Sequence, residues 1–432
     1  MNSSRISYNI HGQNVPDMPR LLQHLQAIQP YAVLVMDNLG LAKELKALLP
    51  RTLVIFRAWP DDAIHQQMTP EQWIQHKLSE TGGSDLWLYT SNEPGFGDDL
   101  LDWTSRLIEL TAPRGMKLVV GNFSVGTPRP EEWERPAAVR LLRLLDQHRQ
   151  TVILGLHEYA CGVITSGFIG GEPQFIAPHS WPQTPAALTK WHCGRFSLLV
   201  SVCHRLGIGA PRIVLTEHGF DDVSDIKPWA ERLLRDAPYL NVRGWKSLRS
   251  QWNAWFGGLA WSPERAYFEQ LAYADRAIYQ QSPVEAQLIF SWGYSSRDWE
   301  QFDISQAFEF QSLLENYARQ GVPTPAPVVP RAVPPSPTAP GFAPIGVRSP
   351  EELARSATPS QPQPSVPPVR SEQLAAPAVE SAAGITLILT PEEAQAVITG
   401  FRTAAASGLF GAAVSAAFAA IAAALERGQG SG

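Results

Sequence analysis

The chain reads DLWLYTSNEPG at residues 85–95, where a short apolar and aromatic run meets a polar group and then a Pro-Gly pair. The run at residues 86–89 predicts a buried strand, and the Pro-Gly pair predicts where that strand ends. Such a strand delivers the carboxylate of Glu93 to one end of the sheet that it joins, with the amide of Asn92 beside it. We therefore interpret Glu93 as one half of a catalytic pair, whose partner lies at the end of another strand.

Seven further apolar runs of strand length recur along the first three quarters of the chain. The predicted strands cover residues 6–10, 32–36, 52–56, 85–89, 117–120, 151–156, 212–216 and 286–291. Most are rich in Val, Ile and Leu, as parallel strands covered by helices are. Eight strand–helix units in about 315 residues predict an α/β fold of the (β/α)8 TIM-barrel type. An open doubly wound sheet is the alternative, but the residues from His11 onward lack the Gly-rich phosphate loop of that fold.

Segments with apolar residues at helical spacing separate the predicted strands. They cover residues 18–27, 41–49, 70–80, 100–112, 131–148, 185–206, 227–236, 262–280 and 305–319. The segment at 131–148 is the clearest, because its leucines at 141, 142, 144 and 145 form one apolar face. This alternation of strand and helix is what a (β/α)8 barrel requires.

The composition changes abruptly after the predicted barrel, which we place at residues 1–322. Residues 323–383 are dominated by Pro, Ala, Ser and Val. With few large apolar side chains, such a segment does not repay the entropy of ordering it, so we expect a disordered linker. Residues 384–432 are Ala-rich and predict an apolar helix, with Thr390 as its N-cap and Glu393 completing a capping box.

The predicted C-terminal helix has three candidate roles. Residues 403–425 carry no charge, and small residues recur at every fourth position from Ser407 to Ala419. In a membrane that spacing allows close helix contact, and in water the same stripe would join chains in a bundle. The weak hydrophobicity of Ala and the helix-weakening glycines favour self-association or docking to a partner over a membrane span.

Composition excludes several classes of protein. The net charge is −6 and there is no basic block, so we expect no nucleic-acid partner. The cysteines Cys161, Cys193 and Cys203 are odd in number and lack metal-ligand spacing, which argues against a disulfide framework. The N-terminus lacks a basic segment followed by an apolar run, so no secretory signal peptide is predicted. A cytoplasmic or particle-associated location follows as the expectation.

The polar and aromatic residues at the predicted strand ends form a candidate site, because active sites of barrels lie at the C-terminal face. The second carboxylate is Glu217, which follows the seventh strand as Glu93 follows the fourth. Retaining glycoside hydrolysis needs such a pair, since one carboxyl protonates the leaving oxygen and the other attacks the sugar carbon. The candidate catalytic residues are therefore Glu93 and Glu217, and the candidate substrate-binding residues are Asn92, His157, Tyr159, Trp292, Arg57 and Trp59.

At these positions the chain resembles the retaining glycoside hydrolases of the (β/α)8-barrel clan A. The resemblance lies in Asn92-Glu93-Pro94, in Thr-Glu217-His-Gly, in His157-Glu158-Tyr159 and in Trp292, and it covers residues 1–322. It implies hydrolysis of O-glycosidic bonds in an oligo- or polysaccharide by double displacement, without a cofactor. Two departures are visible: the family carries an Arg on strand two, whereas Arg57 falls on strand three here, and a His common near strand three is missing.

The resemblance also implies a role for each residue. Glu93 would be the acid/base, with a raised pKa so that it holds its proton, and Glu217 the nucleophile. Asn92 would bind the sugar 2-hydroxyl, Tyr159 would hydrogen-bond the nucleophile, and Trp292 would form the floor of the subsite for the reacting sugar.

Other interpretations of these residues remain open. Glu217 could instead pair with Arg57, and Tyr159 and Trp292 could be core residues. A non-catalytic carbohydrate-binding or structural barrel, tethered to an assembly, is the competing function, although retention of both carboxylates and the Asn favours an enzyme. A metal centre built from His11, His157, His218 and the two carboxylates is disfavoured, because the His-x-His of such barrels is missing from strand one. We therefore expect no metal.

Overall fold

The computed structural model describes residues 4–58, 61, 63–169, 171–175, 181, 193–222, 242–294, 296–320, 378–380 and 386–388. The chain divides into two units, Met1–Ala332 and Val333–Gly432. Trp59, the predicted helix at 227–236 and most of the predicted linker and C-terminal helix lie outside the described residues.

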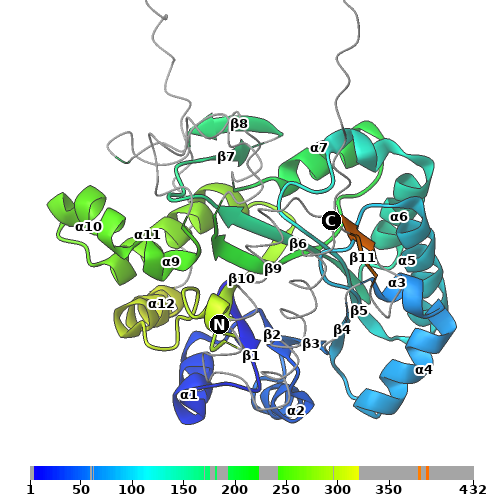
Figure 1. Ribbon diagram of the computed structural model, residues 1–432, viewed down its shortest axis with the longest axis horizontal. Helices are drawn as coiled ribbons and strands as arrows, with labels where there is room; N and C mark the ends of the chain where they lie inside the picture. Colours follow the sequence, from blue (N-terminus) through cyan, green and yellow to red (C-terminus); the bar gives the residue numbers. More distant parts are fainter. Residues whose placement is uncertain are drawn as a thin grey trace, which may run out of the picture. The chain divides into compact units, whose positions relative to one another are not determined.

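Eight parallel strands close into a barrel (Figure 1). They run in the order β1-β10-β9-β6-β5-β4-β3-β2, and β1 pairs with β10 to complete the ring. This confirms the predicted TIM barrel and excludes the open doubly wound sheet. The strands are β1 (Ile6–His11), β2 (Ala32–Met36), β3 (Leu53–Arg57), β4 (Trp87–Tyr89), β5 (Lys117–Phe123), β6 (Val152–Ala160), β9 (Ile213–Phe220) and β10 (Val284–Trp292).

Alternate side chains of the strands build two separate apolar layers, as the pleat of a strand dictates. The barrel interior is a small cluster that includes Trp87 and Tyr89 of β4, whereas Leu88 between them joins the larger cluster that packs against the helices. At the N-terminal end of the barrel, the guanidinium of Arg212 lies 5.5 Å from the centre of the Trp87 ring and pairs with Glu285 at 2.7 Å. These contacts join the starts of β4, β9 and β10 at the N-terminal end of the barrel.

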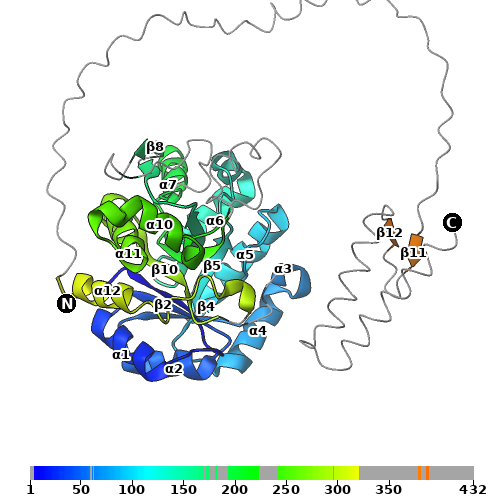
Figure 2. The same cartoon turned by 60° about the vertical axis from the view of Figure 1, so that its left-hand side comes forward.

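Helices cover the outside of the barrel (Figures 1 and 2). Local sequence explains their ends: Thr69 caps α4 in a capping box with Gln72, and Pro70 occupies the first turn. Figure 2 shows α10 beside α11, where the rings of Trp252 and Tyr267 lie 5.7 Å apart. The helices are α1 (Met18–Ile28), α2 (Leu39–Leu48), α3 (Ile64–Gln67), α4 (Pro70–Thr81), α5 (Asp98–Thr111), α6 (Pro136–Gln147), α7 (Phe196–Arg205), α9 (Gly244–Ser247), α10 (Arg249–Phe256), α11 (Pro263–Ala274) and α12 (Phe308–Gln320).

Two features interrupt the regular alternation. The segment after β6 folds into an antiparallel hairpin of β7 (Ser166–Ile169) and β8 (Glu172–Phe175). The predicted helix at 262–280 is α-helical to Ala274 and continues as a π-helix at Asp275–Tyr279.

In the second unit, β11 (Ala378–Glu380) pairs antiparallel with β12 (Thr386–Ile388). Among the described residues, no helix has both the length and the apolar character that a membrane span requires.

Candidate active site

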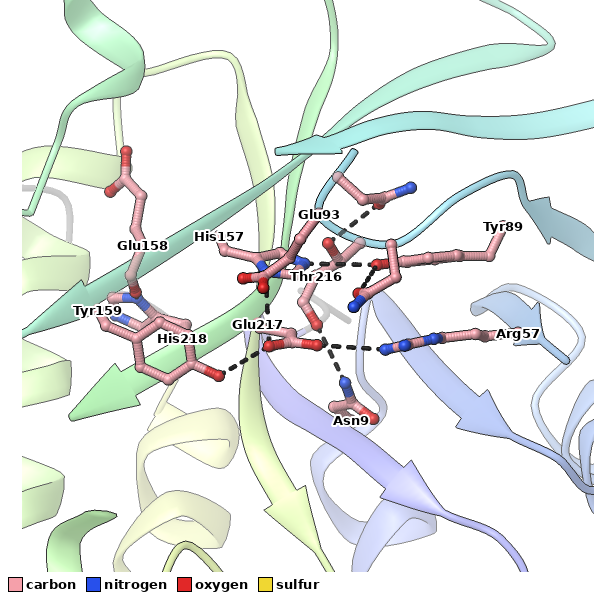
Figure 3. Close-up of polar contacts among 12 residues, drawn as sticks. Asn9, Arg57, Tyr89, Glu93, His157, Glu158, Tyr159, Thr216, Glu217 and His218 are labelled. Carbon is pink, nitrogen blue, oxygen red and sulfur yellow. Dashed lines mark hydrogen bonds and ion pairs between the residues drawn. The ribbon is translucent and has the colours of Figure 1, made fainter. Parts of the chain in front are cut away.

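Two glutamates and a histidine meet at the C-terminal end of the barrel (Figure 3). Glu93 lies in the loop after β4, His157 lies in β6 and Glu217 lies in β9. One carboxylate oxygen of each glutamate and a ring nitrogen of His157 all lie within 4.8 Å of one another. The sequence places these residues far apart, and the closed ring of strands brings them together.

The loop that carries Glu93 is held in an unusual backbone conformation. Glu93 has φ 41°, and Asn122 in β5 has φ 47°, both in the left-handed region that side chains disfavour. The backbone N–H of Glu93 donates to the carbonyl of Asn122 at 3.1 Å, and the Asn122 amide donates to the carbonyl of Ser91 at 3.1 Å. Such conformations persist only where neighbouring contacts hold them, and they gather at functional sites. The side chain of Glu93 is 43% exposed, so its carboxylate reaches solvent.

The carboxylate of Glu217 is nearly enclosed, with 11% of its side chain exposed. The Tyr159 hydroxyl donates to Oε2 at 2.9 Å, and Arg57 Nη1 lies 3.3 Å from Oε1. His157 Nδ1 lies 3.5 Å from Oε2. Burial raises the pKa of Tyr159 well above its usual value, so its hydroxyl stays protonated and remains a donor. The site thus surrounds Glu217 with donors and one fixed positive charge.

Arg57, the last residue of β3, reaches Glu217 from the opposite side of the ring of strands. Its guanidinium also contacts Asp61 through Nε at 2.8 Å, and it lies 5.1 Å from the centre of the Tyr89 ring. Arg57 therefore does contact the second carboxylate, although it comes from the third strand and not from the second.

The expected raised pKa of Glu93 is contradicted by its surroundings. His157 Nδ1 lies 3.0 Å from Glu93 Oε1, and this hydrogen bond lowers the pKa of Glu93 below its usual value, against a smaller opposing effect of partial burial. The sequence placed His157 near the site, but it did not show that its ring would lie against this carboxylate.

Trp292 does not face the site. Its side chain is fully buried and packs against Tyr8, with ring centres 5.1 Å apart, and against His24 at 5.7 Å. The reason is a shift in register: Asn9 of β1 pairs with Phe290, whereas the next residue of β1 pairs with Trp292. The extra residue forms a bulge and turns Trp292 toward the helices. The prediction that Trp292 lies under the reacting sugar is wrong.

Aromatic side chains that the sequence did not single out lie nearer the site. Phe290 contacts Trp299 and Phe302, with ring centres 5.6 Å and 5.3 Å apart. The ring of Phe302 in turn lies 6.4 Å from that of Tyr159. Trp299 is partly exposed and sits in a short turn after β10. No strand pattern marks that turn, so the sequence offered no signal for it.

Asn92 precedes Glu93 and is tied to the barrel interior. The buried Tyr89 hydroxyl donates to Asn92 Oδ1 at 2.9 Å and lies 3.4 Å from His157 Nε2. A pocket of about 530 Å³ opens beside this loop, and its lining includes Asn92, Glu93, His65, Phe96 and Asp99. The pocket gives a ligand direct access to the Glu93 carboxylate.

The five-residue metal centre considered from the sequence does not assemble. His218 turns away and places Nδ1 2.6 Å from the carbonyl of Glu158, while the His11 ring packs on Phe290. Glu93, His157 and Glu217 alone lie close enough to share an ion among the described residues. His157 Nδ1 contacts both carboxylates, which makes this set a hydrogen-bonded network as it stands.

Several solved structures of glycoside hydrolases are similar to this chain at low identity. A β-glucuronidase from Ruminococcus gnavus, in complex with D-glucaro-d-lactam, aligns with 72% of the chain at 10% identity and a TM-score of 0.40. Its complex with D-glucuronic acid aligns at 11% identity and the same TM-score of 0.40. A GH5 xyloglucanase from Bacteroides ovatus, in complex with a XXXG heptasaccharide, aligns with 71% of the chain and 74% of its own at 7% identity and a TM-score of 0.33.

The chain spans about half the length of the β-glucuronidase, because the alignment covers 49% of that protein. No protein-family model matches the sequence, and no curated protein matches it.

Proposed function

We propose that the protein is a retaining glycoside hydrolase that cleaves O-glycosidic bonds in an oligo- or polysaccharide. The observation that carries the proposal is the approach of the Glu93 and Glu217 carboxylates, which have oxygens within 4.8 Å of each other. Retaining enzymes hold their two carboxyl groups about 5 to 5.5 Å apart, whereas inverting enzymes keep them about 6.5 to 9.5 Å apart. The short separation favours double displacement, which needs no cofactor.

Glu217 acts as the nucleophile in this proposal. It is the more enclosed of the two carboxylates, and Tyr159 and Arg57 fix both of its oxygens. A nucleophile must meet the anomeric carbon in one orientation, and two short contacts from separate strands supply that orientation.

Glu93 acts as the acid and base. Its carboxylate lies at the pocket beside the β4 loop, where the leaving group would sit, and it is open to the water that the second step requires. The contact with His157 lowers the pKa of Glu93, whereas the acid step needs a proton on this carboxyl group; His157 Nδ1, 3.0 Å away, is the neighbour placed to share that proton. Asn92 is assigned to the sugar 2-hydroxyl, and the partly exposed Trp299 takes over the apolar role first given to Trp292.

A non-catalytic carbohydrate-binding barrel is the second candidate, and one observation favours it: Glu217 forms a buried ion pair with Arg57. The guanidinium lies closer to Asp61, at 2.8 Å, than to Glu217, at 3.3 Å, so Asp61 makes the tighter pair with Arg57. The enzyme remains the preferred proposal because Glu217 also lies beside Glu93 at the short spacing that double displacement uses.

The proposal is tested with a panel of activated aryl β-glycosides, comparing the native protein with Glu93→Ala and Glu217→Ala in the presence and absence of azide. We expect Glu217→Ala to lose activity. We expect the kcat of Glu93→Ala to fall about 10²- to 10⁴-fold, the usual contribution of a general acid and base, because the attack of water in its second step lacks a base. Azide needs no general base, so it should restore turnover in Glu93→Ala and yield a β-glycosyl azide.

The matched control is Glu44→Ala, which removes an exposed carboxylate from α2 and should leave the rates unchanged. An α-configured azide product from Glu93→Ala would contradict retention. If the native protein turns over no glycoside and binds polysaccharide equally well without both glutamates, the binding protein replaces the enzyme as the proposed function.

A further inference from the structure

Tyr89 places a buried hydroxyl between two residues of the candidate site. Its ring lies inside the barrel at 1% exposure, and the guanidinium of Arg57 lies over it. The hydroxyl donates to Asn92 Oδ1 at 2.9 Å and lies 3.4 Å from Nε2 of His157. Burial raises the pKa of Tyr89 well above its usual value, so the hydroxyl keeps its proton.

The hydroxyl has one proton to donate, and the shorter contact shows where it goes. With the proton directed to Asn92, the Tyr89 oxygen offers only lone pairs to His157. Nε2 of His157 must then carry a hydrogen in order to bond with Tyr89. In a neutral imidazole the other nitrogen is then a bare acceptor.

That bare acceptor, Nδ1, lies 3.0 Å from Oε1 of Glu93. Two acceptors at this distance repel unless a proton lies between them, because neither a carboxylate oxygen nor an unprotonated ring nitrogen can donate. One proton must therefore be shared by Glu93 and His157. The charged groups that face this pair are Arg57 from β3 and Glu217 from β9, and the neutral Tyr159 hydroxyl faces it from β6.

We propose that Tyr89 is a positioning residue that fixes the Nε2–H tautomer of His157, so that Glu93 and His157 store between them the proton given to the leaving group. This inference rests on the proposed glycosidase function and names the source of its acid proton. As Glu217 bonds to the anomeric carbon, the glycosidic C–O bond breaks and its electron pair goes to the leaving oxygen, which takes the stored proton from Glu93. In the second step water attacks the same carbon, the bond to Glu217 breaks and restores its carboxylate, the hydroxyl stays on the sugar, and the other water proton returns to the pair.

The kinetic test uses Tyr89→Phe, which keeps the ring beneath Arg57 and removes only the hydroxyl. Two substrates of one sugar are compared, a 2,4-dinitrophenyl β-glycoside, whose leaving group needs no proton, and a phenyl β-glycoside, whose leaving group does. We expect kcat/KM to fall about 10- to 100-fold on the phenyl glycoside and to change little on the dinitrophenyl glycoside. An equal loss on both would mean that Tyr89 acts through Asn92 or through packing, and would overturn the inference.

The matched control is Tyr317→Phe, which removes another buried hydroxyl, the donor to Asp275 Oδ2 at 2.8 Å, far from the site in the outer helix layer. In this variant, the ratio of kcat/KM on the phenyl glycoside to kcat/KM on the dinitrophenyl glycoside should equal that of the native protein.

A second measurement does not depend on activity. Nitrogen-15 NMR of the labelled imidazole of His157 should show a protonated Nε2 at neutral pH in the native protein, and an unprotonated Nε2 in Tyr89→Phe. An unprotonated Nε2 in the native protein would refute the inference even if the enzyme is active. A protonated Nε2 in a protein that cleaves no glycoside, and that binds polysaccharide equally well without both glutamates, would leave the tautomer assignment standing and refute the proposed function instead.

Discussion

His218 is the neighbour of Glu217 in β9, yet its chemistry concerns stability. Its ring is fully buried, donates the Nδ1 hydrogen to the carbonyl of Glu158 at 2.6 Å, and packs edge-on against Tyr279. Burial lowers the pKa of His218 to about 4, because the charged imidazolium loses its hydration there. Alternate residues of a strand face opposite sides, which explains why adjacent residues have such different roles.

The lowered pKa of His218 predicts a pH-dependent loss of stability. The pKa of a histidine in the unfolded chain is about 6.5. Between this pH and a pH of about 4, the unfolded chain binds a proton at His218 that the folded chain does not bind. The free energy of unfolding should therefore fall across this window as pH falls, with a contribution from His218 on the order of 3 kcal/mol. Denaturant unfolding of the native protein and of His218→Gln, at about pH 7.5, 6, 5 and 4.5 so that the window is spanned, measures the difference in their free energies of unfolding.

The two proteins are compared by how steeply the free energy of unfolding changes with pH, because the substitution also changes packing and so shifts that free energy by a constant amount. The stability difference between the two proteins should shrink or reverse as pH falls from 7.5 to 4.5, values that bracket the predicted window. Parallel curves would show that His218 does not titrate differently in the folded and unfolded chain.

At the residue scale, sequence reasoning located the two carboxylates and the neighbouring His157, Tyr159 and Arg57, which the barrel brings together. It misplaced Trp292, because a one-residue bulge in β10 depends on pairing with β1 and leaves no mark in the local pattern. It also expected the wrong direction for the pKa of Glu93. That pKa depends on the 3.0 Å contact with His157, which is a tertiary distance and not a motif.

Among the elements, β6 divides its consecutive residues between the candidate site and the packing of the fold. His157 and Tyr159 point to the pair of carboxylates, whereas Glu158 points away from it (Figure 3). The Glu158 carboxylate accepts the backbone N–H groups of Gly194 and Phe196, both at 2.8 Å, at the start of α7. Tyr279 donates to it at 2.9 Å. Strand β6 is thereby tied to the helix that follows the hairpin insertion.

We predict that Glu158→Gln destabilises the protein and largely spares its chemistry. The amide keeps one acceptor oxygen but sets an NH₂ group against donors, which leaves buried N–H groups without a partner at a cost of about 1–3 kcal/mol. The measurement pairs denaturant unfolding with kcat/KM on the best aryl glycoside. Unchanged stability with a loss of activity comparable to that of Glu217→Ala would place Glu158 in the site and contradict this assignment.

The ends of the strands were the least predictable elements. The sixth strand was expected to end at residue 156 and the seventh at 216, but β6 continues to Ala160 and β9 to Phe220. Several of the added residues are polar, and a cluster of polar residues normally signals a loop. Here they stay in the strands because His157, Tyr159 and Glu217 make contacts at the site, while the Glu158 carboxylate accepts backbone N–H groups at the start of α7.

At the scale of the molecule, the barrel is complete within the first unit. Every strand of the ring lies between Ile6 and Trp292, and the last covering helix, α12, ends at Gln320. From composition alone, the sequence predicts that the barrel ends near residue 322, since the apolar periodicity stops where the Pro-rich stretch begins, and this boundary stays a prediction. The roles proposed for residues 323–432 remain predictions.

We expect a chain truncated after Ala332 to fold and to keep the activity of the full protein. Its core and all pairs between barrel strands are retained, so the midpoint of thermal unfolding, followed by circular dichroism, should not change. A lower midpoint or a loss of activity on the same aryl glycoside would mean that the barrel depends on the rest of the chain. A separately made fragment of residues 333–432 is then added. It should restore the midpoint if a contact was lost, and leave the midpoint unchanged if the truncation itself damaged the terminus.

The pairing of β1 with β10 has a consequence for how the protein is made. The first strand leaves the ribosome long before the last, and the partner of Ile6 is Gln287. Until that residue emerges, the nascent sheet has two open edges, and open edges are sites at which growing chains stick to one another. Glu93 and Glu217 likewise become neighbours only when the ring shuts. A stalled or prematurely terminated translation product would therefore carry both carboxylates without the closed site. It would also expose unpaired strand edges, which are prone to aggregation and are a surface for molecular chaperones.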